Sequence, residues 1–273
     1  MTAATSSVGD RYVLATGELG ARRLQLLNEV YGPTTEQFLL RAGLKPGMRV
    51  ADIGCGTGTV SCWLAQQVGP GGSVVGIDAS PDQLQVARNR ASAAGLTNVS
   101  FKEGSAYATG LPRGSFDLAF TRLLLCHLNR PEDGVKEMTA LLHSGGILAC
   151  EDLDLATLAS DPPTAAYDRI RALCLALGEK RCVDYARGAS LHRLFHQQQL
   201  TPITTVVQPA LSVGEVKRVW EYTFLEAVPA MIEEGVTTAE EVAQLAPALE
   251  AVAIDPQTIV YHPRLVQVSA TKR

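Results

Sequence analysis

The sequence has few aromatic residues, few charges and no excess of basic residues. Aromatic residues make up 5% of the 273 residues, charged residues make up 19%, and the net charge is −4. A chain without a positive excess gives no sign of nucleic acid or of an anionic membrane surface as a partner. Hydrophobic residues still make up 46% of the chain, which is enough for a sizeable core. The composition is therefore that of an ordinary globular protein.

Long apolar runs are absent as well. No stretch approaches the length that a membrane-spanning helix needs, and residues 1–10 lack the apolar centre of a signal peptide. We therefore expect no membrane insertion and a location in the cytoplasm.

The sequence contains no Cys-x-x-Cys pair. Its six cysteines are Cys55, Cys62, Cys126, Cys150, Cys174 and Cys182. Most of them lie among apolar residues, which is typical of reduced thiols packed in a core rather than of a disulfide framework or a zinc site. A thiol site for a soft ion such as arsenic would need several of them to meet in space. We expect no metal site.

The middle of the chain alternates between two patterns. Short apolar stretches at residues 49–53, 73–78, 99–102, 116–120 and 147–150 are typical of strands. Helical patterns lie between them at 59–68, from Ser80-Pro81 to Gly95, and at 131–142. Ser80 is placed to cap its helix, Pro81 suits the first turn, and Gln83 could complete a capping box. Strands that alternate with helices predict an α/β fold with a doubly wound, mostly parallel sheet.

The flanking segments are mainly helical. The pattern predicts N-terminal helices at 18–31 and 35–40, separated by a break at Gly32-Pro33. After Glu151 it predicts helices at 162–177, 189–198, 213–233 and 238–252, and strands at 203–207 and 265–271. We expect a single domain over residues 1–273. Its parts are a helical cover (1–45), a cofactor-binding core (46–153) and a helical cap that contributes to the substrate region (154–200 and 212–252).

The first strand ends in a glycine-rich turn. Gly54, Gly56 and Gly58 stand at every second position, which suits a sharp bend and a close approach of backbone to ligand. A dinucleotide site needs Gly-x-Gly-x-x-Gly/Ala, but Thr59 and Ser61 occupy the third position in the two possible registers. The acid Asp78 follows at a suitable distance, so spacing alone leaves a nicotinamide-dependent oxidoreductase open.

A carboxylate precedes the turn. Asp52 lies at the end of the first strand, where it would repel a pyrophosphate and attract an ammonium group. In addition, no tyrosine has a lysine four residues later, so the usual equipment for hydride transfer is missing. Both features favour a ligand that carries an ammonium group.

Residues 52–58, Asp-Ile-Gly-Cys-Gly-Thr-Gly, resemble motif I of class I S-adenosylmethionine-dependent methyltransferases. Further similar segments lie at 45–50, 75–81, 104–106, 111–118 and 141–148. The likeness extends over about residues 46–153. The nearest likeness is to the ubiquinone/menaquinone-biosynthesis and small-molecule methyltransferases. The resemblance implies a Rossmann-like, seven-stranded sheet with an antiparallel last strand, and S-adenosylmethionine as the cofactor.

The resemblance also implies roles for single residues. Asp52 would bind the methionine ammonium, and Asp78 would accept from both ribose hydroxyls. The predicted cofactor-binding set is Asp52, Gly54, Gly56, Gly58, Asp78, Ala79, Ser105, Ala106, Thr121 and Arg122. Ser105 departs from the acid that is frequent at its family position.

Methyl transfer from a sulfonium is an in-line displacement that depends mainly on orientation. His127 follows the fourth strand and is the candidate general base; a packing role is the alternative. The candidate substrate-binding residues are Tyr12, Glu151, Asp152, Tyr185 and Tyr222. The sequence thus predicts methyl transfer to a small organic acceptor. A non-methylating protein on the same fold, such as a cyclase or a sensor, and the oxidoreductase remain alternatives.

Overall fold

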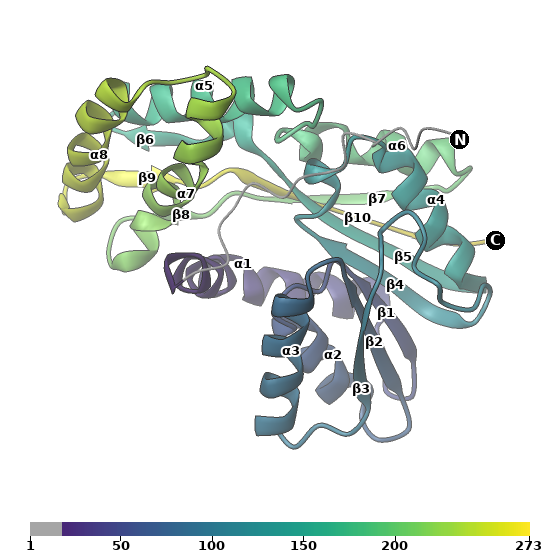
Figure 1. Ribbon diagram of the computed structural model, residues 1–273. Coiled ribbons are helices and arrows are strands. Elements are labelled where there is room, and N and C mark those ends of the chain that lie inside the picture. The colour runs from purple at the N-terminus through teal and green to yellow at the C-terminus, as the bar shows by residue number, and fades with distance from the viewer. Residues whose placement is uncertain (1–17) are drawn as a thin grey trace, which may run out of the picture.

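A seven-stranded sheet forms the centre of the molecule (Figure 1). The computed structural model describes residues 18–273. The sheet has the order β3-β2-β1-β4-β5-β10-β7. Its strands are β1 (Arg49–Ile53), β2 (Ser73–Asp78), β3 (Val99–Glu103), β4 (Phe116–Arg122), β5 (Leu142–Asp154), β7 (Ile203–Val207) and β10 (Arg264–Thr271). The pairs among β1 to β5 are parallel, whereas β10 runs antiparallel between β5 and β7. The predicted fold class is confirmed.

Helices cover both faces of this sheet, as a doubly wound fold requires. The helices are α1 (Glu18–Ala42), α2 (Thr59–Val68), α3 (Pro81–Ala93), α4 (Pro131–Leu141), α5 (Ala165–Lys180), α6 (Leu191–Gln197), α7 (Val219–Glu233) and α8 (Ala239–Ile254). Side chains of α2 and of the second half of α1 pack on one face, and those of α4 and α6 pack on the other. Both faces of the central strands are therefore buried, which explains their nearly continuous apolar sequences.

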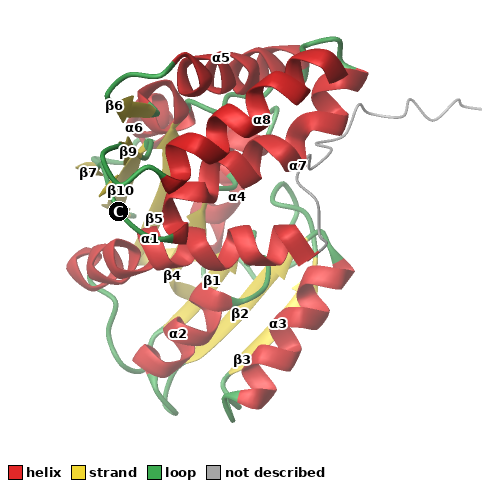
Figure 2. Ribbon diagram, turned by 90° about the vertical axis from the view of Figure 1, so that its left-hand side faces the viewer, coloured by secondary structure: helices red, strands yellow, loops and turns green. Residues whose placement is uncertain are grey.

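A second layer of helices lies beyond the carboxyl ends of the parallel strands. Helices α5, α7 and α8 pack together with the first half of α1 around a separate apolar cluster, and Figure 2 shows them stacked above α1. We call α5, α7 and α8 the helical cap. No helix within residues 18–273 is long and apolar enough to cross a membrane.

The predicted break at Gly32-Pro33 is wrong, because α1 is one continuous helix with Pro33 inside it. Proline removes one backbone hydrogen bond from a helix. Here the hydroxyls of Thr34 and Thr35 donate to the Tyr31 carbonyl at 2.8 and 3.1 Å. Packing then holds both halves, since the first half is buried in the cap and the second against the sheet.

Two further features were not predicted. Strand β5 extends from Leu142 to Asp154, well beyond the predicted 147–150, and absorbs the Gly145-Gly146 turn through a shift in its register with β4. A small antiparallel sheet joins β6 (Ala159–Asp161), β9 (Ile259–Tyr261) and β8 (Ala210–Leu211). Strands of two or three residues are too short to show a period in the sequence.

Candidate active site

The glycine-rich turn brings bare backbone to the carboxyl end of β1. The amides of Gly54 and Cys55 donate to the Ile77 carbonyl at 2.7 and 3.0 Å, which ties the turn to β2. Gly54 and Gly56 have φ angles of 74° and 52°, which side chains rarely tolerate. A Cβ atom on Gly54 would also lie 2.9 Å from the Leu124 side chain. These positions therefore require glycine.

Asp78 shapes this turn from the end of β2. Its Oδ2 atom accepts from the Gly56 amide at 2.8 Å, and its Oδ1 atom accepts from the Ser80 amide at 2.9 Å. The Ser80 hydroxyl caps α3 through the Gln83 amide at 3.3 Å. The reciprocal half of the predicted capping box is not formed, because the Ser80 amide is used by Asp78. Each oxygen of Asp78 retains acceptor capacity toward a ligand.

One cavity of about 1220 Å³ starts at this turn. Nine of the predicted site residues line it on the side of the sheet: Asp52, Gly54, Gly56, Asp78, Ala79, Ser105, Ala106, Arg122 and His127. Tyr185 lines it as well. The opposite wall comes from α1, α5 and α7. The structure thus brings together most of the predicted cofactor residues, the candidate base and one candidate substrate residue.

Five predicted residues do not line the cavity. Gly58 packs against α3, where a Cβ would lie 2.7 Å from that of Ala87. Thr121 is fully buried in β4. Tyr222 lies on the outside of α7 and donates to Glu215 at 3.2 Å. Glu151 and Asp152 are fully buried in β5. Tyr12 lies outside the described residues.

Asp52 is 2% exposed and accepts from the Ser61 hydroxyl at 2.5 Å. Burial raises the pKa of its carboxyl to about 6, although the Ser61 hydrogen bond and the nearby Arg122 guanidinium act in the opposite direction. A cationic group bound beside Asp52 would favour its ionised form.

Arg122, at the end of β4, and Glu151, opposite it in β5, form a polar cluster. Arg122 donates to Thr35 at 3.2 Å and to Asn28 at 3.1 Å, both on α1. Glu151 is fully buried and accepts from Gln267 at 2.6 Å. Burial raises the Glu151 pKa to about 7, against the opposing effect of Arg122. The cluster links α1 to the sheet. Glu151 does not line the cavity, but it lies beside Arg122, which does.

Asp152 is also fully buried, and it holds the loop after β4. Its two oxygens accept from the Cys126 amide at 2.9 Å and from the Leu153 amide at 3.0 Å. Burial raises the Asp152 pKa to about 6. The loop that it fixes contains a short 3-10 turn, Leu125–His127. Asp152 therefore positions His127 instead of contacting the cavity.

His127 lies in this turn and lines the cavity. Its ring meets that of Tyr185 edge to face, with centroids 5.4 Å apart, so the two rings lie side by side in the cavity wall. The helical wall lies where the sequence predicts helices, but its lining residues are not among the predicted site residues. They include Arg23, Leu24, Leu27, Cys174, Leu177, Trp220, Thr223, Ala227 and Met231.

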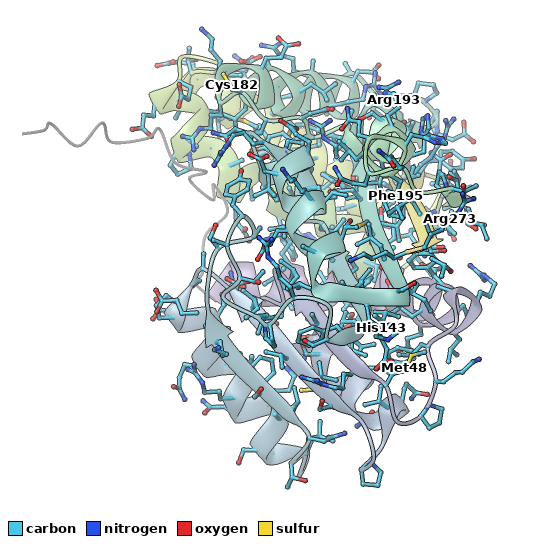
Figure 3. The ribbon with its side chains drawn as sticks, turned by 90° about the vertical axis from the view of Figure 1, so that its right-hand side faces the viewer. Met48, His143, Cys182, Arg193, Phe195 and Arg273 are labelled. Atoms are coloured by element: carbon cyan, nitrogen blue, oxygen red, sulfur yellow. The ribbon has the colours of Figure 1, made fainter. Side chains whose placement is uncertain are left out.

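All six cysteines are within the described part of the chain, and all are free. Cys182, beyond the end of α5, lies at the periphery of the cap (Figure 3). No group of three or more metal-ligating side chains occurs within residues 18–273. The site is therefore described by its backbone turn, its carboxylates and its apolar wall.

Comparisons with known proteins agree with this geometry. A family model described as "Methyltransferase domain" matches residues 44–208. Methyltransferase GfsG from Streptomyces halstedii is 29% identical over 76% of this chain and 72% of its own length. A demethylmenaquinone methyltransferase from Listeria monocytogenes is 35% identical over 40% of this chain, and the match spans less than half (46%) of that enzyme.

Solved structures share the fold at low identity. A putative methyltransferase from Bacillus halodurans has a TM-score of 0.60 and 18% identity, with 87% of this chain and 97% of that chain covered. The cyclase SpnF has a TM-score of 0.53 and 19% identity, with coverages of 95% and 98%.

The chain belongs to the methyltransferase domain family. It is an S-adenosylmethionine-dependent methyltransferase, and S-adenosylmethionine is its cofactor.

Proposed function

We propose that this enzyme transfers a methyl group to a small, largely apolar organic acceptor that binds against the helical wall of the cavity. One observation carries the proposal: a single cavity joins the glycine-rich turn to a chamber lined by leucine, methionine and aromatic side chains. Small-molecule sites are commonly concave and mostly apolar, with a few polar groups that fix orientation. Family membership favours this activity over nicotinamide-dependent oxidation.

The residues at the turn fit the cofactor. Gly54 and Gly56 line the cavity without a side chain, so a ligand can approach their backbone closely, and Asp78 offers acceptor capacity to a pair of ribose hydroxyls. Asp52 supplies a carboxylate for an ammonium group. We assign the cofactor-binding role to the predicted residues that line the cavity, and we assign Gly58 and Thr121 to the packing beneath it.

The bound cofactor supplies a methyl group on a positively charged sulfur, and the transfer leaves a neutral thioether. The task of the protein is then to align the acceptor and to exclude water. Leu123 and Leu124 follow β4 and line the cavity near the turn, together with Leu153 and Leu155. His127 would take the proton from an acceptor hydroxyl or amine as the new bond forms.

We propose that residues 46–153 hold the cofactor and that the cover (1–45) and the cap (154–200 and 212–252) complete the acceptor chamber. The acceptor is accordingly a small molecule rather than nucleic acid, because the chamber wall is apolar and enclosed by buried side chains. We also propose that the enzyme acts in the cytoplasm, as the sequence predicts.

A methyl-label transfer assay against a metabolite extract tests the proposal. We expect a labelled product that is more soluble in organic solvent than in water. A protein that binds S-adenosylhomocysteine yet labels no acceptor would contradict methyl transfer and would favour the cyclase-like alternative.

The same assay tests His127. We expect His127→Ala to leave S-adenosylhomocysteine affinity nearly unchanged and to lower kcat by about 100-fold or more if the residue is the base. His192→Ala on α6, outside the cavity, is the matched control. Full turnover of His127→Ala would assign His127 to packing against Tyr185.

A further inference from the structure

The helical wall of the cavity contains two buried N–H donors without a partner. They are Nη2 of Arg23, on α1, and Nε1 of Trp220, on α7. Arg23 is 3% exposed and Trp220 is 6% exposed, and both residues line the cavity. A buried donor that lacks a partner is unfavourable. Two of them on one wall indicate that a ligand supplies the missing acceptors.

The rest of this wall offers a ligand little else to bind except apolar surface. The hydroxyl of Thr223 is used within its own helix, where it donates to the Val219 carbonyl at 2.7 Å. Apolar side chains make up most of the remainder, namely Leu24, Leu27, Cys174, Leu177, Ala227 and Met231. The two nitrogen donors are thus the polar features of the helical wall that could orient a molecule.

The charge of Arg23 is already balanced. Its Nε atom donates to Oε2 of Glu226 at 2.9 Å, and the two side chains are 3% and 1% exposed. Glu226 does not line the cavity, and its Oε1 atom is also buried without a partner. An anion in the chamber would meet a neutral pair and would have to lose its own hydration, so it gains little. A neutral oxygen accepts a hydrogen bond without that cost.

We infer that the acceptor is a predominantly apolar molecule with neutral oxygen atoms (carbonyl, ether or hydroxyl) that accept hydrogen bonds from Arg23 Nη2 and Trp220 Nε1. The inference rests on the proposed function for the identity of the chamber as the acceptor site. It adds the chemistry by which the chamber selects its ligand. It also assigns Arg23 and Trp220 as determinants of specificity, on elements that lie outside the cofactor-binding core.

Calorimetry with three compounds of one skeleton tests the inference: tetralin, 1-tetralone and tetralin-1-carboxylate. Each is titrated into the protein saturated with S-adenosylhomocysteine. We expect the ketone to bind about 3- to 10-fold more tightly than the hydrocarbon, which is the usual effect of one hydrogen bond. The carboxylate should bind more weakly than the ketone. Equal affinities for ketone and hydrocarbon, or a preference for the carboxylate, would overturn the inference.

Two variants locate the preference. Trp220→Phe removes Nε1 and keeps an aromatic ring, and Arg23→Lys removes Nη2 and keeps a charge for Glu226. Each should reduce the ketone preference by about 3-fold or more and leave tetralin affinity unchanged. Trp63→Phe is the matched control, because Trp63 lies on α2 and does not line the cavity. A preference that survives in both cavity variants would refute the assignment.

The cofactor measurement separates this inference from the proposed function. S-adenosylhomocysteine affinity should be the same in the wild-type protein and in both variants. If Arg23→Lys weakens S-adenosylhomocysteine binding by about 10-fold, Arg23 contributes to cofactor binding and the inference fails. The proposal of methyl transfer would still stand. If none of the three compounds binds at 0.3 mM, the chamber does not accept apolar rings of this size and the inference fails. A missing methylated product would instead contradict the proposed function.

Discussion

At the scale of single residues, Asp78 combines two tasks. It folds the glycine-rich turn through the amides of Gly56 and Ser80, and its remaining lone pairs face the cavity. We expect Asp78→Ala to weaken S-adenosylhomocysteine binding by about 2–3 kcal/mol, because a charge-assisted contact to two hydroxyls is lost. Calorimetry measures this change directly.

The control is Asp117→Ala. Asp117 also accepts from a backbone amide, that of Arg49 at 2.7 Å, but it lies at the other end of the strands and does not line the cavity. Its loss should lower stability without changing affinity for S-adenosylhomocysteine. Unchanged affinity in Asp78→Ala would remove the ribose role from Asp78.

Sequence reasoning worked well for residues whose neighbours are local. The turn and Asp78 are separated by one helix, and the spacing of strand, glycines and acid predicts their meeting at the sheet edge. It worked less well for Glu151 and Asp152, which the sequence placed at the acceptor pocket. Strand β5 continues through both residues, and Gln267 from β10 covers Glu151. A contact between residues so far apart leaves no mark in a local pattern.

At the scale of elements, the start of α2 depends on Gly58. Its φ is 73°, and a Cβ there would approach Ala87 to 2.7 Å and Phe101 to 3.0 Å. We expect Gly58→Ala to lower the free energy of unfolding by roughly 2–4 kcal/mol, because backbone strain and a clash between α2, α3 and β3 add together. Chemical denaturation measures the effect.

Gly95, just beyond the end of α3, is a matched comparison. Its φ is 65°, and nothing lies within 4 Å of the position of a Cβ. Gly95→Ala should therefore cost only the strain of the backbone, about 1 kcal/mol. Equal losses of unfolding free energy in the two variants would mean that α2 and α3 can move apart at little cost. Packing would then not explain why position 58 is glycine.

The predicted break in α1 is wrong because the prediction used only the residues around Pro33. A Gly-Pro pair commonly ends a helix, but the gain from burying both halves exceeds the loss of one hydrogen bond. Leu26 and Tyr31 pack in the cap, and Phe38 and Leu39 pack against the sheet. Such tertiary packing depends on residues more than a hundred positions away, so the sequence around Pro33 could not reveal it.

At the scale of the whole molecule, three fully buried carboxyls couple stability to pH. Burial raises the pKa values of Asp52 and Asp152 to about 6 and that of Glu151 to about 7. The folded protein therefore binds more protons than the unfolded chain between about pH 4 and 7, and its stability falls as pH rises through this window. We expect a loss of roughly 3–4 kcal/mol between pH 5.5 and 8.

Denaturant unfolding at a series of pH values measures this slope. Glu151→Gln mimics the neutral acid and can still accept from Gln267, so it should flatten the slope and leave stability at pH 8 equal or higher. An unchanged slope in this variant would show that Glu151 does not titrate in the window.

The position of β10 governs how the sheet is assembled. Within residues 18–273, strand β7 joins the large sheet through β10 alone, and β10 follows all the helices described there. While the polypeptide emerges from the ribosome, β5 and β7 each keep an open edge until Arg264–Thr271 has been synthesised. Unpaired edges invite association with other chains. A chain that ends before Arg264 would therefore expose two unpaired strand edges and would depend on chaperones. Its glycine-rich turn would already have been synthesised.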